Sequence, residues 1–426
     1  MKIKIKHVSY EQVLQMKKPK HKRPKKPSFL FSTIIRALAI PDLIATRFKY
    51  TKERMEPAPT GPYLILMNHS SFIDLKIASK IFYPMPYNIV CTSDALVGKE
   101  WLMRNIGCIP TQKFVSDITL ISDIIHSIKK NRTSVLMYPE AGYTFDGCAT
   151  PLPRGLGRLF KKLDVPILTV ITDGAFLRDP LYNNLQLRKV KVTATLKCLF
   201  TQQEVRDLSV EQLDARLDEA FTFDNFENQF KTKTVIDEPF RADGLERLLY
   251  RCSECEAEDK MEGLGTVITC KKCSKQHTLD IYGKLEAKDG KTRFSHIPDW
   301  YNWQRDCVKH EIESGKYKLD IDVKIGILKD YKAIYMVGDG HLYHDINGFK
   351  LTGCEGKLEY TQSPLASYEL NADYYWYEIG DVISIGNKDL LYYCFPKDKV
   401  NVAKVRFAAE EIYKIQKERT RKIKNG

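Results

Sequence analysis

A histidine and an aspartate lie five positions apart in the segment 67–74, Met-Asn-His-Ser-Ser-Phe-Ile-Asp. Within one regular helix the two side chains would point about 140° apart, because each residue turns the helix by about 100°. His69 must therefore lie on a turn before a helix that carries Asp74, with Ser70 or Ser71 as its cap. An imidazole held by a carboxylate has a fixed tautomer and a more basic second nitrogen. Such a pair predicts a general base that takes a proton from an attacking hydroxyl.

The spacing alone indicates little, because nine histidines produce about half a His-x4-Asp pair by chance. The alternative is a solvated turn histidine beside an aspartate at a helix start. Further blocks follow in order, however. They are Asn-Ile-Gly-Cys-Ile-Pro-Thr-Gln-Lys at 105–113, Tyr-Pro-Glu-Ala-Gly at 138–142, Asp146-Gly147, Pro151, Arg154-Gly155 and Asp-Val-Pro-Ile at 164–167.

Together the blocks resemble the motifs of the glycerolipid acyltransferases of the lysophosphatidic acid acyltransferase superfamily: Asn-His-x4-Asp, Gly-x-Ile-x3-Arg, Phe-Pro-Glu-Gly-Thr-Arg-Ser and a Val-Pro-Ile strand. The resemblance covers about residues 60–200. It implies an α/β layer fold of the glycerolipid-acyltransferase type. It also implies direct attack of a hydroxyl on the thioester of acyl-CoA or acyl-carrier protein, with His69 as general base, Asp74 as its orienting partner and no acyl-enzyme. Backbone amides would stabilise the oxyanion.

The same resemblance implies a substrate-binding set. Asn68, Glu140 and Gly142 belong to its matching blocks, with Glu140 on the acceptor side of the pocket. Two positions depart from the family, since Lys113 and Tyr143 stand where arginines hold the acceptor phosphate. Lysine does this planar, bidentate task less well, and tyrosine has no charge for it. We therefore expect an acceptor other than lysophosphatidic acid, such as an uncharged hydroxyl on a lipid or glycan.

Two arginines downstream offer replacement charge. Arg154 is a candidate substrate-binding residue, and Arg158, one helical turn later, could add a second positive charge. The alternative is that both are solvated arginines on a helix surface, where most arginines lie.

Two Cys-x-x-Cys pairs, Cys252/Cys255 and Cys270/Cys273, are separated by fourteen residues that include two glycines. This spacing predicts two knuckles that close one tetrahedral site, and four thiolates leave no open position for substrate. The prediction is a structural zinc ribbon. His277 could compete as a ligand, although a surface histidine is the simpler interpretation. The other seven cysteines are scattered and are expected to be free thiols.

The elements that position these residues can be predicted from apolar periodicity. Strands are expected at 63–67, 87–91, 134–138 and 166–171, with helices at 117–130, 298–315 and 402–422. Short strands with turn signals fill 319–396. This region, closed by the last helix, vaguely resembles a pleckstrin-homology-like barrel, a shape that often binds lipid headgroups or protein partners. Its aromatic residues are interpreted as sheet packing.

Composition limits the function classes. A chain of 426 residues with 43% apolar residues predicts about three folded units. Of the formal charge of +13, residues 1–60 carry +11, so the body offers no broad basic face for nucleic acid. No apolar core of a secretory signal follows the first residues, and the cysteine usage indicates a reducing interior. A cytoplasmic protein is expected.

The basic charge gathers in the segment 17–27, which contains three prolines and is expected to be a solvated arm. An apolar segment follows at 28–40 and is stopped by Pro41-Asp42, too short to span a bilayer. It is interpreted as an interfacial helix or as an ordinary docked helix. We expect residues 1–48 to attach the protein to anionic lipid on the inner face of the cell membrane without crossing it.

The expected domain order is a basic arm at 1–28, an interfacial or docked helix at 29–55, the acyltransferase domain at 56–235, the zinc ribbon at 236–285, a helical linker at 286–318 and a β-rich domain with its C-terminal helix at 319–426. The leading hypothesis is a membrane-peripheral acyltransferase of phospholipid biosynthesis that acylates a lysolipid or related acceptor. The alternative is an inactive acyltransferase-like zinc-ribbon module that binds lipid, nucleic acid or a protein partner.

Overall fold

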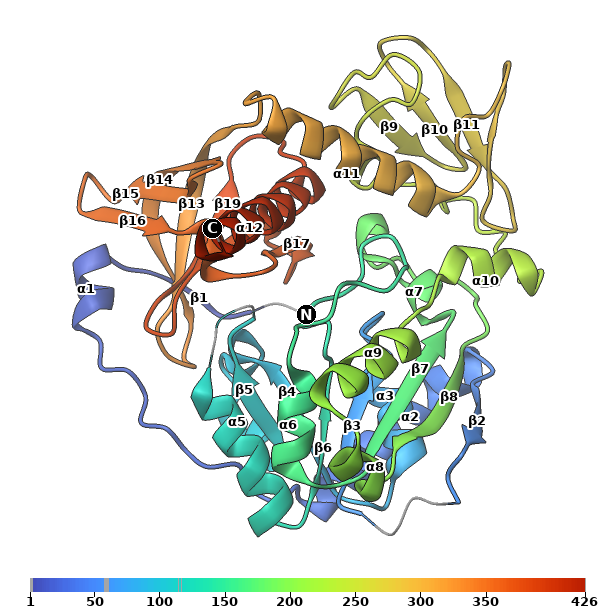
Figure 1. The fold of residues 1–426 in the computed structure, drawn as a ribbon. Coiled ribbons are helices and arrows are strands. Elements are labelled where there is room, and N and C mark those ends of the chain that lie inside the picture. The colour runs from blue at the N-terminus through green and yellow to red at the C-terminus, as the bar shows by residue number, and fades with distance from the viewer. Residues whose placement is uncertain (1–2, 57–60, 114, 116, 426) are drawn as a thin grey trace.

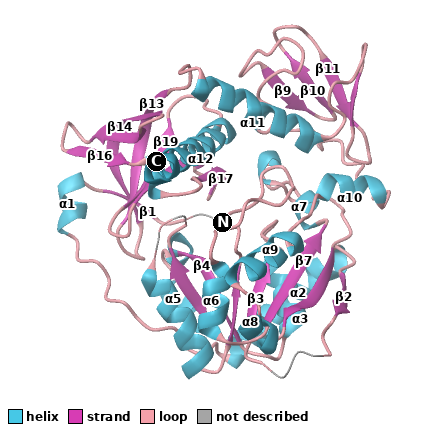
Figure 2. Cartoon of the chain, in the orientation of Figure 1, coloured by secondary structure: helices cyan, strands magenta, loops and turns pink. Residues whose placement is uncertain are grey.

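Three sheets organise the computed structural model, which describes residues 3–56, 61–113, 115 and 117–425. A seven-stranded sheet has helices on both faces, and a small four-stranded sheet and an eight-stranded, mainly antiparallel sheet lie beyond it (Figures 1 and 2). The chain is therefore a mixed α/β protein with a β-rich C-terminal part and a final helix, as the sequence predicted.

The seven-stranded sheet positions the His-Asp block. Its strands, in spatial order, are β2 (Lys49–Glu53), β8 (Thr193–Phe200), β7 (Ile167–Asp173), β3 (Leu64–Met67), β6 (Ser134–Met137), β4 (Tyr87–Thr92) and β5 (Cys108–Thr111). Neighbouring strands are parallel except for the antiparallel β7/β8 pair. The four strands predicted from apolar runs are confirmed within one to two residues at each end.

Helices cover both faces of this sheet, which is why its central strand is apolar throughout. In β3, Ile65 and Met67 pack with α2 (Phe29–Ala45) and α3 (Asp74–Phe82), whereas Leu64 and Leu66 pack on the opposite face. That face carries α5 (Ile118–Ile125), α6 (Leu156–Leu163), α8 (Gln202–Asp207) and α9 (Val210–Ala220). The predicted helix at 117–130 is confirmed, with its last turn as the π-helical η2 (His126–Lys130).

Helix α2 differs from its predicted end. It continues through Pro41 to Ala45, because burial of Ala39 and Leu43 in the core shared with α3 compensates for the one backbone hydrogen bond that a proline removes. None of the described helices combines the length and apolar composition that crossing a bilayer requires.

The four-stranded sheet contains β9 (Met261–Leu264), β10 (Val267–Cys270), β11 (Gln276–Leu279) and β12 (Leu285–Ala287), all antiparallel. Helix α11 (Ile297–Glu313) leads from it to the C-terminal domain (Figure 1). Further helices are α4 (Glu100–Asn105), α7 (Ala175–Arg178) and α10 (Asn225–Lys231). Shorter helical segments are η1 (Ser93–Leu96), η3 (Leu181–Asn183), η4 (Leu245–Arg247) and η5 (Pro364–Ala366).

The C-terminal domain is an antiparallel meander closed by a helix. Its strands are β13 (Leu319–Leu328), β14 (Ile334–Asp345), β15 (Gly348–Gly353), β16 (Leu358–Gln362), β17 (Asn371–Trp376), β18 (Gly380–Gly386) and β19 (Leu391–Pro396), in the spatial order β16-β15-β14-β13-β19-β18-β17. Helix α12 (Val402–Asn425) lies across them (Figure 1). The predicted strands followed by one closing helix are confirmed.

The start of the chain belongs to this C-terminal domain. Strand β1 (Ile5–His7) pairs in parallel with β14, and α1 (Tyr10–Gln15) buries Tyr10 and Val13 in the same core. The predicted unit of residues 1–28 as a separate arm is therefore wrong for the residues described. A sequence pattern could not reveal this pairing, because its partner strand lies more than three hundred positions away.

The basic segment is also docked rather than solvated. His21 and Arg23 reach the Asp123 carboxylate at 2.9 and 3.1 Å, and Lys22 pairs with Glu100 at 2.8 Å. The Asn88 and Asn131 side chains donate to backbone carbonyls of this segment. The proline-rich segment 17–27 thus forms no regular element, but contacts with other parts of the chain hold it in place. The expectation of a solvated arm is wrong.

Candidate active site

The His-Asp pair lies on the turn between β3 and α3, at the carboxyl edge of the sheet. The His69 Nδ1 atom is 3.0 Å from the Asp74 Oδ2 atom. The same oxygen accepts hydrogen bonds from the backbone N–H groups of Ser70 and Ser71 at 2.9 and 3.2 Å. An ionised carboxylate only accepts, so Nδ1 carries the proton and Nε2 keeps its lone pair.

The predicted turn is present, and the Ser71 hydroxyl accepts from the Ile73 N–H at 3.3 Å, although Ser71 is not the residue that caps α3. The N-cap of α3 is Ile73, whose side chain makes no cap hydrogen bond. The Asp74 carboxylate accepts hydrogen bonds from the backbone N–H groups of the turn. Asp74 therefore both begins the helix and orients the His69 imidazole. Because its oxygen is shared between the turn and His69, the geometry of the pair depends on the turn.

Two tyrosine rings enclose the imidazole. The Tyr138 and Tyr143 rings stack on opposite sides of the site's histidine, with centroids 3.9 and 3.8 Å from that of His69. Burial lowers the pKa of His69, the Asp74 hydrogen bond opposes this shift, and the Lys113 charge adds to the lowering. The imidazole is therefore neutral at pH 7, and its side chain keeps 17% exposure. A neutral, partly exposed imidazole is in the form that a general base requires.

Glu140 braces the turn rather than facing open space. Its Oε2 atom accepts from the His69 N–H at 3.0 Å, and its Oε1 atom accepts from the Thr150 N–H at 3.0 Å. The carboxylate has no exposed surface, and burial raises the pKa of Glu140 to about 7. In this structure the residue ties the loop 138–150 to the backbone of His69.

The Asn68 side chain likewise forms its hydrogen bonds within the protein. Its Oδ1 atom accepts from the Thr172 N–H at 2.8 Å, and its Nδ2 group donates to the Thr172 carbonyl at 3.1 Å and to the Ser70 hydroxyl at 3.2 Å. The side chain is fully buried. It therefore joins the end of β3 to β7 and positions the turn, with no face left for a substrate.

Three other predicted residues do border an open space. Lys113, Gly142 and Tyr143 line a small cavity, and the Lys113 Nζ atom lies 6.0 Å from the centroid of the Tyr143 ring. The opposite wall comes from the C-terminal domain. It consists of Leu370, Asn371, Ala372 and Asp373, together with Arg406 of α12, while Phe145 closes the near side.

The structure does not bring Arg154 to this cavity. Its guanidinium pairs with Asp218 of α9, and its side chain is 68% exposed. Arg158 is exposed on α6. The interpretation of these arginines as replacement phosphate ligands is wrong for this arrangement, because the chain after residue 150 turns away to form a surface helix.

Sequence reasoning missed a buried ionic network behind the turn. The Ser71 hydroxyl donates to Asp179, which also accepts from Arg178 at 2.9 Å, and Arg178 reaches Asp42 of α2 at 3.1 Å. Burial raises the pKa of Asp179 to about 6. No local pattern signals these contacts, which connect three separate segments.

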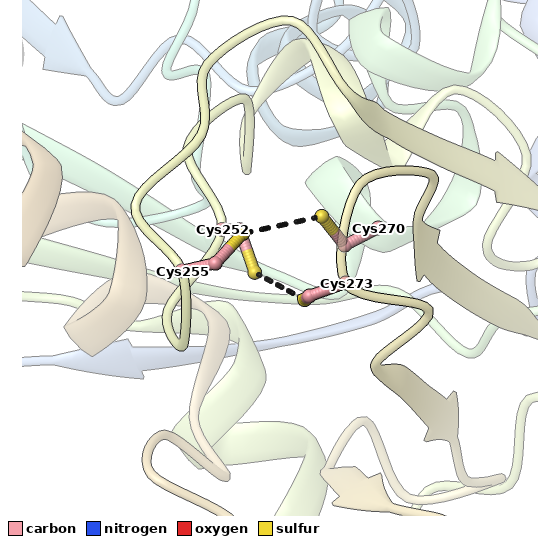
Figure 3. Close-up of side chains that lie close together, drawn as sticks. All are labelled: Cys252, Cys255, Cys270 and Cys273. Carbon is pink, nitrogen blue, oxygen red and sulfur yellow. Dashed lines mark hydrogen bonds between the residues drawn. The ribbon is translucent and has the colours of Figure 1, made fainter.

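The four predicted metal ligands converge from two loops (Figure 3). All four sulfur atoms lie within 4.8 Å of one another, and the Cys252/Cys273 and Cys255/Cys270 pairs are 3.7 Å apart. A tetrahedral zinc ion about 2.3 Å from each sulfur places sulfurs about 3.8 Å apart. The donor set and its spacing therefore fit a zinc ion, and the cluster could hold a metal.

His277 lies outside this cluster and is not on the surface. It is 1% exposed on β11, with its ring 5.0 Å from that of Trp300. The expectation of a surface histidine is wrong, because the ribbon packs this strand against α11.

Comparison with known proteins identifies one part of the chain. Residues 48–173 match the family model described as Acyltransferase, which confirms the resemblance and supports acyltransferase activity in general. The crystal structure of the 1-acyl-sn-glycerophosphate (LPA) acyltransferase PlsC from Thermotoga maritima is similar at 17% identity and a TM-score of 0.36, over 45% of this chain and 76% of that chain. A search of curated proteins finds no match.

Proposed function

We propose that this protein transfers a fatty acyl group from the thioester of acyl-CoA or acyl-carrier protein to a hydroxyl of a lysolipid or related acceptor. The observation that carries the proposal is the His69 imidazole, which Asp74 holds through Nδ1 within the segment that matches the Acyltransferase family model. Asp74 binds only the Nδ1 atom, so the Nε2 atom of the partly exposed His69 is not used by this pair, and an inactive scaffold would not require such an arrangement.

The chemistry follows from this geometry. The His69 Nε2 atom takes the acceptor's hydroxyl proton while the oxygen attacks the thioester carbonyl carbon. Collapse of the tetrahedral intermediate breaks the C–S bond, and the leaving thiolate receives the proton from the imidazolium. Asp74 stabilises the imidazolium that forms between the two steps, so no acyl-enzyme is required.

The acceptor is proposed to be an uncharged hydroxyl rather than lysophosphatidic acid. Tyr143 stacks on the imidazole where the family carries an arginine, and Arg154 is directed to Asp218. Lys113 is the remaining candidate for a phosphate ligand at the cavity. A single ammonium lacks the bidentate geometry that phosphate clamps use.

The four-cysteine site is proposed to hold a structural zinc ion. Cys252, Cys255, Cys270 and Cys273 would be its ligands, and their four thiolates leave no position for substrate. The ion would supply folding energy to a segment whose own core is small.

Membrane attachment is proposed to use α2. Its exposed apolar side chains are Phe29, Leu30, Ile34, Leu38, Ile40 and Ile44, and the exposed Trp101 of α4 contacts Phe31 at a ring distance of 5.6 Å. Lys17, Lys20, Lys25 and Lys26 are exposed nearby in the chain. Such apolar area next to basic charge favours a peripheral position on anionic lipid, at the inner face of the cell membrane, and not nucleic-acid binding.

The test is product analysis. Purified protein is incubated with labelled acyl-CoA or acyl-carrier protein and a panel of lysolipids, monoacylglycerols and glycolipids, and the products are identified by mass. We expect a new ester on an uncharged acceptor with the wild type and none with His69→Ala. Equal product from both proteins would contradict His69 as the base, and lysophosphatidic acid as the best acceptor by a wide margin would contradict the acceptor class.

A further inference from the structure

We propose that Asp373, on β17 of the C-terminal domain, selects the acceptor for the His69 site by binding a hydroxyl-rich, uncharged headgroup and repelling a phosphate monoester. This inference rests on the acyl transfer proposed above and assigns its acceptor specificity to a second domain. Asp373 lies 260 positions beyond Lys113 in the chain, and the two residues line the same cavity.

The cavity is shared between the two domains. Gly142 and Tyr143 of the catalytic loop form one side, and Asn371, Ala372 and Asp373 of β17 form the other. Tyr143 also stacks on the His69 imidazole with ring centroids 3.8 Å apart, so one tyrosine ring connects the wall of the cavity with the proposed base. Asp373 is half-buried in this wall.

The two walls are fastened to each other, which fixes the position of β17 relative to the base. Arg406 of α12 donates to the Tyr143 carbonyl at 3.5 Å, and its guanidinium lies 4.7 Å from the Phe145 ring centroid. The Phe145 ring in turn contacts Tyr374 of β17 at 4.6 Å. These contacts connect β17, which carries Asp373 next to Tyr374, to the loop that carries Tyr143.

The charges around this cavity disfavour a second phosphate ligand. Arg406 is engaged by Glu369, and by Glu410 at 3.2 Å, which neutralises its charge. Burial raises the pKa of Asp373 to about 6, although the Lys113 ammonium opposes this shift. The Asp373 carboxyl and the Lys113 ammonium thus influence each other in the lining of one cavity.

This combination suits one class of headgroup. A carboxylate accepts hydrogen bonds from neighbouring sugar or polyol hydroxyls, and a nearby ammonium donates to their oxygens. A phosphate monoester at the same place would set its negative charge against Asp373 in a partly buried site, where repulsion is weakly screened. The site therefore favours a glycosyl or polyol lipid over lysophosphatidic acid.

The test compares Asp373→Asn with the wild type on a monoglycosyl monoacylglycerol and on lysophosphatidic acid of the same acyl chain. Loss of a hydrogen bond to a charged group should raise KM for the glycosyl acceptor by about ten- to a hundredfold, with kcat little changed. The ratio of kcat/KM for lysophosphatidic acid to that for the glycosyl acceptor should rise by at least tenfold. Asp398→Asn is the matched control, because it removes one exposed carboxylate from the same domain.

Lys113→Gln gives a second measurement that does not depend on the folding of the first variant. Because it removes the Lys113 ammonium from the lining of this cavity, it should lower the use of lysophosphatidic acid further. An unchanged ratio in Asp373→Asn, with an active wild type, would overturn this inference alone. No transfer by the wild type to any acceptor would overturn the proposed function and the inference with it.

Discussion

The catalytic turn and the wall that faces it are built in opposite ways. In the turn, the His69–Asp74 pair forms between residues five positions apart, and a single Asp74 oxygen binds His69, Ser70 and Ser71. The facing wall is assembled from 370–373 and Arg406, far away in the chain. The proposed base and its orienting carboxylate are therefore neighbours in the chain, whereas the proposed choice of acceptor depends on the packing of a second domain.

Removal of the metal should have the largest effect and should act on the facing wall. The ribbon segment holds this wall, since the Arg247 carbonyl accepts from the Tyr374 hydroxyl at 2.7 Å and Glu258 pairs with Lys404 at 2.7 Å. Structural zinc contributes about 10–16 kcal/mol to the folding of small zinc domains. We expect about one zinc per chain by metal analysis, and loss of the ribbon's structure in Cys270→Ser.

The control for that variant is Cys354→Ser, a buried cysteine outside the cluster. Protein that retains its thermal unfolding midpoint after complete metal removal, or that contains less than half an equivalent of zinc when carefully purified, would contradict the assignment.

Removal of the base should lower the rate on every acceptor. His69→Ala is expected to lose about a hundredfold to ten-thousandfold in kcat, because general base catalysis contributes about that much. Asp74→Asn should cost less, since the base remains. His341→Ala is the control, because it removes another carboxylate-paired histidine at a distance from the site. Unchanged turnover in His69→Ala would end the hypothesis.

Breaking the contact between the two regions should affect stability first. Arg406→Met leaves Glu369, which is 3% exposed, without its cation, and removing one partner of a buried pair costs about 3–5 kcal/mol. We expect a lower free energy of unfolding in denaturant titrations and a weaker preference among acceptors. Lys397→Met serves as the comparison, since its ion pair with Asp339 is exposed and should cost under about 1 kcal/mol. Equal losses in both variants would contradict the fastening role of Arg406.

The membrane surface can be separated from the site with a single substitution. Leu38 is 69% exposed on α2, and Leu38→Gln should lower sedimentation with anionic vesicles by about tenfold or more, because burial of one leucine contributes about 1.5–3 kcal/mol. Leu14→Gln on α1, with an exposed leucine elsewhere, is the control. Deletion of residues 1–48 is a poor test, because β1 and α1 are part of the C-terminal core. Equal vesicle binding by both variants would remove this role from α2.

The smallest expected effect is on the pH profile. Activity should fall as the pH drops through the pKa of His69, which burial places below its usual value, because the protonated imidazole cannot accept a proton. Lys113 contributes to this lowering, so Lys113→Gln should move the acid limb of kcat/KM to higher pH by less than about one unit. A shift to lower pH would contradict the electrostatic coupling of Lys113 to the base.

Sequence reasoning succeeded where partners are near one another in the chain. The turn geometry of His69, the two cysteine knuckles and the strands of the parallel sheet all follow from spacing and apolar runs over a few residues. It failed for Asn68 and Glu140, for which the resemblance to the family's motifs implied substrate contact, because their hydrogen bonds go to Thr172 and Thr150. The hydrogen-bond partners of these two side chains come from tertiary contacts, which the residue type does not reveal.

The larger failures concern contacts over long sequence distance. The pairing of β1 with β14 and the docking of the segment 17–27 on Asp123 and Glu100 could not be predicted, because charge and proline content describe only the segment itself. Asp373 was missed for the same reason. It lies within an aromatic strand whose pattern indicates sheet packing, and only the position of that strand brings it to the cavity.

The most direct test of this division between chemistry and acceptor choice is one set of steady-state measurements. Values of kcat and KM are determined for the wild type, Asp74→Asn and Asp373→Asn on a glycosyl monoacylglycerol and on lysophosphatidic acid. We predict that Asp74→Asn lowers kcat on both acceptors by the same factor, whereas Asp373→Asn changes the ratio of kcat/KM between them by at least tenfold. Equal losses on both acceptors in Asp373→Asn, or a change of preference in Asp74→Asn, would contradict the account.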